Sequence, residues 1–338
     1  MGLDAPLSFS PRFQHYIWGG RHLESVLGRR IPDGDVAESW EISAHRAAVT
    51  PVRGGEFDGM PLDELHARYG DALVGRRGRW ATERGVFPLL VKLLDANRPL
   101  SVQVHPDDAY ARAHEGDAEL GKTEMWYVLW AREGAEIVFG LKPGTTRESL
   151  ETAVRAGRVE DCLRRVPAKA GDAFLIEAGT VHAILDGILI AEVQQSSNTT
   201  YRVHDWGRVG ADGRPRDLHI RQALDVIDFR AGQEAPSVPQ KLETEKGTAV
   251  RRETVSSSDK FVVERVVIPA GEGFRGTLDG ETMEIWGVLT GVAAVKGEGG
   301  EVDLSGVAFG LLPATMGPFE ISAQSEVEAL RVYLPDAG

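Results

Sequence analysis

A predicted strand in the first third of the chain carries two polar side chains with the chemistry of metal ligands. The stretch PLSVQVHPDD (residues 99–108) alternates apolar and polar residues up to Pro106, which ends the strand because proline cannot donate to a strand ladder. Side chains alternate between the two faces of a strand, so Gln103 and His105 project side by side from one face. By itself the pattern favours a half-exposed strand with a polar outer face. A metal site requires further ligands from other strands.

Two further candidate ligands lie in later strand-like segments. Glu124 follows Lys122 in GKTEMWYVL, and His182 opens a strand in GTVHAILDG. Taken singly, Glu124 fits an exposed strand edge and His182 fits a hydrogen-bonded polar residue. Together with His105 and the Gln103 carbonyl, they would form a set of two nitrogen and two oxygen ligands. Such a set suits Zn²⁺ and leaves room for water or substrate.

The composition is that of an ordinary globular protein. The chain has 338 residues, of which 42% are hydrophobic and 26% charged, so it can build a sizeable core and is long enough for two domains. The net charge of −13 argues against a nucleic-acid surface, but a few local Lys and Arg residues can still attract a small anion. We therefore expect no nucleic-acid partner.

The numbers and positions of cysteine and histidine limit which residues could form a metal site and where it could lie. The single cysteine, Cys162, excludes an intramolecular disulfide and a cysteine-rich zinc site, and we expect it to pack in a core. All nine histidines lie at or before His219, so an imidazole site belongs to the first two-thirds of the chain.

Targeting signals are not evident. The segment from Met1 to Pro11 is short and contains two prolines, unlike a signal peptide, and no apolar run approaches the ~20 residues of a membrane span. We expect a soluble, cytoplasmic protein without a membrane partner.

Short apolar runs bounded by Gly, Pro, Asp or Asn predict a mainly β protein. Helical periodicity is confined to residues 61–75, 145–157 (with Thr146 as cap) and 158–166. The polar, proline-containing residues 231–260 indicate a connecting segment. The chain is thus predicted as two β-barrels: a domain over 1–230 with a helical insert at about 145–166, and a second over 261–338.

Several motifs, in the same order, resemble the type I mannose-6-phosphate isomerase family of zinc enzymes. The similar segments are HYIWGGRHL, ESWEIS, PLLVKLLDANRPLSVQVHP, KTEMWYVL, GTVHAI and EVQQSSNTTYRVHDWGR, whereas the C-terminal part matches only in general pattern. The resemblance implies two cupin-type (jelly-roll) barrels, the second without a metal site. It also implies one zinc ion per chain, held by Gln103, His105, Glu124 and His182.

The family reaction interconverts mannose 6-phosphate and fructose 6-phosphate through a cis-enediol. It requires a Lewis acid, a base that reaches a carbon-bound proton, and cations for the phosphate. The resemblance implies Arg202 as the active-site arginine and places Glu192 in the active site, as a base or behind the ligands. Lys92 and Lys122 are candidates for a proton relay or the phosphate anchor.

Other residues complete the predicted site. Ser101 is a candidate for substrate binding. Trp18 fits either the sugar pocket or a core. Lys92 interrupts an apolar run, where it needs an acidic or anionic partner unless it reaches solvent at a strand edge. Asn198 stands where the family has an aspartate and cannot act as a base, so we expect it to order its loop.

The turn before Glu192 makes a structural prediction. A two-residue hairpin turn at Asp186–Gly187 would put Glu192 on the face opposite His182. A three-residue loop, Leu185 to Gly187 with Gly187 at positive φ, would put both on the same face. We predict the three-residue loop.

Two other functions are compatible with the sequence. A non-catalytic sugar-phosphate sensor would keep the fold and metal, and Asn198 is consistent with it. A metal-dependent oxygenase would use iron, usually without a glutamine ligand. The sequence leaves open a monomer or a homodimer.

Overall fold

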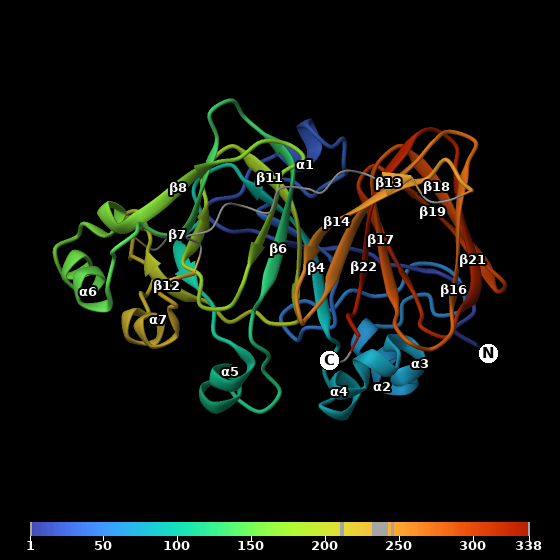
Figure 1. Cartoon of the computed structure of the whole chain (residues 1–338), viewed down its shortest axis with the longest axis horizontal. Helices are drawn as coiled ribbons and strands as arrows, with labels where there is room; N and C mark the ends of the chain where they lie inside the picture. The colour runs from blue at the N-terminus through green and yellow to red at the C-terminus, as the bar shows by residue number, and fades with distance from the viewer. Residues whose placement is uncertain (1, 210–212, 232–242, 245–246, 337–338) are drawn as a thin grey trace.

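The computed structural model describes residues 2–209, 213–231, 243–244 and 247–336. These residues fold mainly as strands in four antiparallel sheets, which confirms the prediction of a mainly β protein. Figure 1 shows the sheets following one another along the long axis of the molecule. The N-terminal sheets are on the left and the C-terminal sheets, in orange and red, on the right.

Two sheets come from residues 12–204. The six-stranded sheet has the order β2 (Arg12–Gln14), β3 (Glu38–Ile42), β4 (Leu89–Ala96), β11 (Ile188–Gln195), β6 (Glu124–Ala131) and β9 (Ala173–Ile176). The five-stranded sheet has the order β12 (Tyr201–His204), β5 (Val102–Val104), β10 (His182–Ile184), β7 (Glu136–Leu141) and β8 (Leu163–Pro167).

The other two sheets are built mainly from the C-terminal part. The seven-stranded sheet has the order β1 (Leu7–Ser8), β20 (Ala308–Leu312), β17 (Glu284–Thr290), β22 (Val327–Tyr333), β15 (Val262–Ile268), β14 (Arg251–Ser257) and β13 (Glu243–Thr244). The four-stranded sheet has the order β16 (Gly273–Leu278), β21 (Gly317–Ala323), β18 (Val292–Gly297) and β19 (Gly300–Ser305). Because β1 pairs with β20, the N-terminal strand belongs to the C-terminal sheet.

Apolar side chains on both faces of the six-stranded sheet determine the order of the layers. On β4, Val91 and Leu93 pack in a core shared with β15, β17 and β22 of the seven-stranded sheet. Leu94 and Ala96 pack in a different core, shared with β7 and β10 of the five-stranded sheet. Odd and even positions of one strand therefore serve two cores, as expected of a sheet covered on both sides. The candidate metal ligands lie along the second core, between the six-stranded and five-stranded sheets.

The helices lie at the edges and outer faces of the sheets. They are α1 (His22–Ser25), α2 (Leu62–Tyr69), α3 (Asp71–Val74), η1 (Arg76–Gly78), α4 (Arg79–Glu83), α5 (Asp108–His114), α6 (Arg147–Arg155), η2 (Val159–Cys162) and α7 (Ile220–Val226). The helix predicted over 61–75 is interrupted at Gly70, whose φ is +46°. Thr146 caps α6 by accepting a hydrogen bond from the Ser149 amide, as predicted. Cys162 is half-buried against the core beneath α6 and α7.

Two predicted segments need correction. The helix predicted over 158–166 is wrong beyond Cys162, because residues 163–167 form β8 and pair with β7. Of the predicted connecting segment 231–260, residues 232–242 and 245–246 lie outside the described residues. Residues 251–257 are strand β14 rather than a connector, since Val255 packs in a core and the strand pairs with β15. None of the helices in the described ranges has the length and apolar character needed to cross a bilayer.

The seven-stranded sheet carries a half-buried cation between two carboxylates. Arg331 on β22 is the cross-strand neighbour of Glu264 and Trp286, and its guanidinium contacts both Glu264 and Glu284. The ring of Trp286 donates to Glu284 at 2.7 Å. The described part of the C-terminal sheets therefore has a charge cluster formed by its own side chains.

We expect Arg331→Met to destabilise the protein. The substitution leaves two largely buried carboxylates without their cation, which costs about 3 kcal/mol of unfolding free energy, measurable by urea denaturation. Arg275→Met, which removes an exposed partner of Glu320, should cost below about 1 kcal/mol. Equal effects of the two variants would contradict this account of the cluster.

Candidate active site

Two rows of polar side chains face each other between the six-stranded and five-stranded sheets. In the five-stranded sheet, Gln103 on β5 has Arg202 and His182 as its cross-strand neighbours. In the six-stranded sheet, Glu192 on β11 has Lys92 as its neighbour on one side and Trp126 on the other. Because cross-strand neighbours point to the same face of a sheet, each row presents its side chains to the space between the sheets.

Three of the predicted ligands converge in this space. His105, Glu124 and His182 are fully buried, and each offers a ligand atom within 4.8 Å of the other two. His182 Nε2 lies 3.3 Å from Glu124 Oε1, and His105 Nε2 lies 3.5 Å from Glu124 Oε2. The residues come from β10, β6 and the end of β5, so the cluster depends on the packing of both sheets.

The tautomer of His182 indicates that this cluster fits a cation. Its Nδ1 donates to the Thr180 carbonyl at 2.8 Å, so its Nε2 carries a lone pair. That lone pair faces a carboxylate oxygen, and burial lowers the pKa of His182. A neutral imidazole nitrogen and a carboxylate at this separation are both electron-pair donors without a proton between them. A divalent cation would satisfy both.

Gln103 and Lys122 complete the surroundings of the cluster. The amide nitrogen of Gln103 lies 3.3 Å from His182 Nε2, and rotation of the amide brings its oxygen to the same place. The Lys122 ammonium lies 2.9 Å from Glu124 Oε2 and 3.0 Å from His105 Nε2. All four predicted ligands are therefore adjacent, and a lysine approaches them from the side.

The charges around the cluster favour an ionised Glu124 and neutral histidines. Burial opposes the charge of Glu124, but the neighbouring Lys122 ammonium holds the pKa of its carboxyl below the ordinary value. Burial, and then the neighbouring Lys122, lower the pKa of His105 well below its usual range. These are the protonation states that bind a metal ion.

Lys92 lies in a second charged cluster beside the first. It is only 3% exposed, and its ammonium lies 3.4 Å from Glu192 and 3.7 Å from Glu38. Burial alone would lower the pKa of Lys92, but Glu38 and Glu192 raise it above the ordinary value. Lys92 is thus not a strand-edge lysine that reaches solvent, and it has the acidic partners that its position requires.

Glu192 is the point of contact between the two clusters. Burial, and then the charge of Glu124, raise the pKa of Glu192. The Trp126 ring nitrogen donates to one of its oxygens at 3.0 Å, and Lys92 lies near the other. A buried carboxyl group held between a cation and a second carboxylate is well suited to proton transfer.

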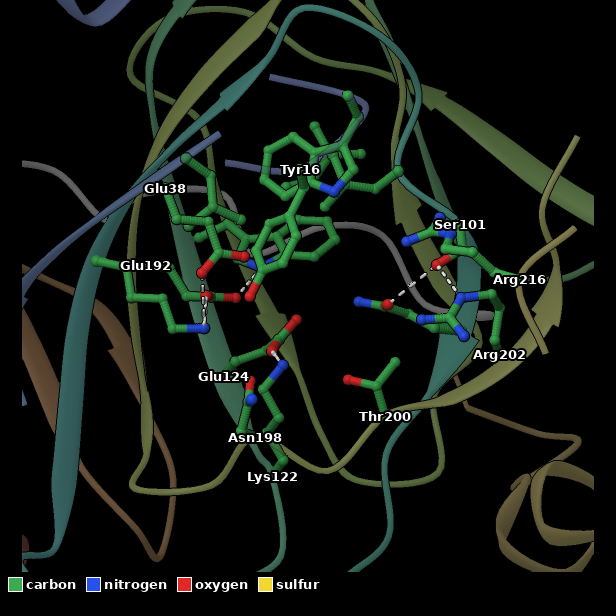
Figure 2. A pocket seen from close by; sticks show the side chains of 17 residues that line it. Tyr16, Glu38, Ser101, Lys122, Glu124, Glu192, Asn198, Thr200, Arg202 and Arg216 are labelled. Carbon is green, nitrogen blue, oxygen red and sulfur yellow. Dashed lines mark hydrogen bonds and ion pairs between the residues drawn. The ribbon is translucent and has the colours of Figure 1, made fainter. Parts of the chain in front are cut away.

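Both clusters border one cavity of about 270 Å³, the first through Glu124 and the second through Lys92, Glu38 and Glu192. Figure 2 shows Glu38, Glu124 and Glu192 on one side of this cavity, and Ser101, Arg202 and Arg216 on the other. Arg202 Nε donates to the Ser101 hydroxyl at 3.3 Å. The cavity thus has an acidic side next to the candidate metal ligands and a side rich in arginine.

The loop before Glu192 has the predicted length, but its strands do not form a hairpin. Residues 185–187 separate β10 from β11, and Gly187 has a φ of +79°. However, β10 pairs with β5 and β7 whereas β11 pairs with β4 and β6, so the loop crosses from one sheet to the other. Glu192 lines the cavity, and His182 contacts Glu124 on the opposite sheet, because the two sheets face each other.

The remaining predicted residues have mixed outcomes. Ser101 and Trp18 both line the cavity, and Trp18 is also part of the core, which combines its two expected positions. Asn198 lies on the cavity wall, and its side chain hydrogen-bonds none of the described residues. The expectation that Asn198 orders its loop is therefore wrong. The buried Gln194 does so instead by donating to the carbonyls of Gln195 and Ser197.

Four polar residues of the cavity wall were missed by sequence reasoning: Tyr16, Glu38, Thr200 and Arg216. Tyr16 and Glu38 lie within motifs singled out above, and Glu38 alternates with Trp40 as a one-faced strand pair would. That alternation was the available signal. Nothing local distinguishes Arg216 from the other arginines near it in sequence.

The fold and the site define a β-sheet protein with a buried cluster that could hold a metal ion and a cavity suited to a small anionic ligand. Comparison with known proteins then gives the family. The family described as phosphomannose isomerase type I, catalytic domain, matches residues 7–127. A mannose-6-phosphate isomerase of Streptococcus mutans is 47% identical over 234 residues, which are 69% of this chain and 71% of that protein.

Two matches extend over nearly the whole chain. A probable mannose-6-phosphate isomerase of Bacillus subtilis, GmuF, is 35% identical over 95% of this chain and 97% of its own length. The crystal structure of the mannose 6-phosphate isomerase from Bacillus subtilis superposes with a TM-score of 0.84 at 33% identity, covering 97% of this chain and 99% of that one. The chain belongs to the mannose-6-phosphate isomerase family.

Proposed function

We propose that this protein interconverts mannose 6-phosphate and fructose 6-phosphate through a cis-enediol, with one zinc ion per chain. The observation that carries the proposal is that Glu124 of the His105–Glu124–His182 cluster lines the same cavity as the buried pair of Lys92 and Glu192. An aldose–ketose isomerase needs both an electrophilic site for sugar oxygens and a group that moves a proton between adjacent carbons.

Zinc is proposed because two neutral imidazoles, a carboxylate and an amide oxygen form a mixed nitrogen and oxygen set of the kind that zinc accepts. Gln103, His105, Glu124 and His182 would hold the ion. When bound, it supplies Lewis acidity toward the sugar oxygens, on which negative charge develops during the reaction.

The residues of the acidic side are proposed to move the proton. Glu192 removes the proton from C2 of the aldose while the Lys92 ammonium donates a proton to the C1 carbonyl oxygen, which gives the enediol. The O2 hydroxyl then returns a proton to Lys92, and Glu192 returns its proton to C1 to give the ketose. The Lys92 ammonium lies 3.4 Å from a Glu192 oxygen. When one side chain gains or loses a proton to the substrate, the other can therefore balance the change in charge. Buried groups of this kind exchange protons with substrate rather than with bulk water.

The other cavity residues are proposed to bind the sugar. Arg202 stabilises negative charge on the enediolate, and Ser101 fixes the arginine through the hydrogen bond from its Nε. Lys122, beside Glu124, contacts a substrate oxygen next to the metal ligands. Trp18 provides an apolar wall for the sugar ring.

We also propose the architecture that the resemblance implies. Two facing open sheets are the arrangement of a double-sheet jelly roll, so each pair of sheets is interpreted as a cupin-type barrel. The first would be the catalytic domain within residues 1–230, and the second, within 261–338, would have no metal site. A soluble, cytoplasmic monomer or homodimer is proposed on the same basis.

The proposal is tested by incubating purified protein with mannose 6-phosphate and following fructose 6-phosphate. We expect turnover that a chelator abolishes and added Zn²⁺ restores, together with one metal ion per chain by elemental analysis. Metal binding without turnover would instead identify a sugar-phosphate sensor. Activity that depends on iron and consumes oxygen would identify an oxygenase.

A further inference from the structure

The two lysines that the sequence suggested as phosphate anchors already have anionic partners. Lys92 contacts Glu38 and Glu192, and Lys122 contacts Glu124 at 2.9 Å. A phosphate dianion placed there would face three carboxylates at close range, and repulsion in a buried site is strong. The phosphate of the proposed substrate must therefore be bound elsewhere in the cavity.

The opposite side of the cavity carries a guanidinium held in a fixed orientation. Arg216 lines the cavity, and its Nε and Nη2 donate to the two oxygens of Asp205, with an Nε–Oδ2 distance of 2.8 Å. The Asp205 side chain is only 7% exposed and also accepts a hydrogen bond from Arg208. Within the described residues these bonds leave the Nη1 group of Arg216 available to a ligand.

The charge balance on this side favours an anion. Three guanidiniums, those of Arg202, Arg208 and Arg216, are gathered near two carboxylates, those of Asp205 and Asp217. Burial, and then the positive charge of Arg216, lower the pKa of Arg202. The two cavity-lining arginines therefore repel each other, and an anion bound at Arg216 relieves that repulsion.

We propose that Arg216 binds the phosphate group of the substrate, and that Asp205 is the positioning residue that holds Arg216 in the required orientation. The inference rests on the proposed function and adds a specificity-determining residue to it. The sugar would lie across the cavity with its reacting carbons between the metal ligands and Arg202, and its phosphate at the Nη1 group of Arg216. Figure 2 shows these two arginines on the same side of the cavity, opposite Glu38, Glu124 and Glu192.

Asp205 orients Arg216 because a bidentate carboxylate fixes the plane of a guanidinium. A lysine in place of Arg216 would keep the charge but lose the planar fork, so it should rescue binding only in part. Asp205→Asn keeps the size and one acceptor oxygen but loses the charge that holds the arginine. This variant should weaken phosphate binding without touching the substrate itself.

The test compares Arg216→Gln, Arg216→Lys and Asp205→Asn in the full-length, zinc-loaded protein. We expect Arg216→Gln to raise KM for mannose 6-phosphate by about 10- to 100-fold, with kcat changed less than fivefold. The reason is that a contact to the phosphate stabilises the bound substrate and the transition state equally. Competitive inhibition by inorganic phosphate should weaken by a similar factor. Any slow conversion of unphosphorylated mannose should be unchanged, because this sugar has no phosphate for Arg216 to bind. A general structural defect would lower that conversion as well.

Arg208→Gln is the matched control. Arg208 shares the Asp205 carboxylate but does not line the cavity, so its removal lowers the local charge equally without removing a ligand contact. We expect its KM to stay within threefold of the unmodified protein, with thermal unfolding measured for every variant. The inference is overturned if Arg216→Gln leaves KM and phosphate inhibition unchanged, or if Arg208→Gln has the same effect.

The failure of this inference is distinguishable from failure of the proposed function. If the proposed function is wrong, the unmodified protein neither turns over mannose 6-phosphate nor binds it in calorimetry. If only this inference is wrong, the unmodified protein does both, and the dependence on Arg216 is missing.

Discussion

Glu124→Gln is expected to abolish metal binding and to lower turnover of mannose 6-phosphate by roughly 10³-fold or more. A metal ion contributes several kcal/mol of transition-state stabilisation, and each ~1.4 kcal/mol is a factor of ten in rate. The amide keeps the size of the side chain but removes the only carboxylate of the ligand cluster. Elemental analysis should show the metal content falling from one ion per chain toward zero.

Glu284→Gln is the matched control for this variant. Glu284 occupies an EIW segment on β17 as Glu124 occupies EMW on β6, and both are almost fully buried. Its partner is Arg331 instead of a histidine pair, so the substitution should reduce stability while leaving metal content and turnover intact. Loss of metal from Glu284→Gln, or retention of metal and activity by Glu124→Gln, would contradict the proposed site.

Lys92→Met is expected to lower kcat for isomerisation by about 10²- to 10⁴-fold, the usual contribution of a positioned acid or base. The same substitution leaves Glu38 and Glu192 without their cation, which should cost about 3 kcal/mol of unfolding free energy. Metal content should remain, because Lys92 does not contact the ligand cluster. Steady-state kinetics, urea denaturation and elemental analysis measure the three effects separately.

A double variant separates the two roles of Lys92. Lys92→Met combined with Glu192→Gln removes the cation together with one of its carboxylates, so part of the stability lost in the single variant should return. Activity should not return, because both groups proposed to move the proton are gone. If the double variant regains activity with stability, Lys92 is a structural residue, and the proton must be moved by another group.

Local patterns singled out the residues of the candidate cluster, and the family resemblance implied that they hold one metal ion. Gln103 and His105 share one face of a strand, and Glu124 shares a face with Lys122, as alternation requires. The mainly β character and the cap at Thr146 are equally local, and the structure confirms both. Family resemblance added what alternation does not supply, namely that these separate strands meet.

Local patterns failed where the partner of a segment is distant in sequence. Residues 163–167 have a helical pattern but pair with β7, and residues 251–257 are polar enough for a connector but pair with β15. The loop at 185–187 has hairpin residues, yet it joins two different sheets. In each case pairing and burial decide the conformation, and neither can be read from a window of neighbouring residues.

The sequence by itself determined which residues can bind a metal ion, that they lie before residue 220, and that they are carried on strands. Only the tertiary structure decided that Lys92 has two carboxylate partners, that Asn198 lies on the cavity wall, and that Arg216 lies across the cavity from Glu124. The physical reason is that side-chain alternation is a property of one strand, whereas a cavity is formed by two sheets whose facing surfaces are set by packing.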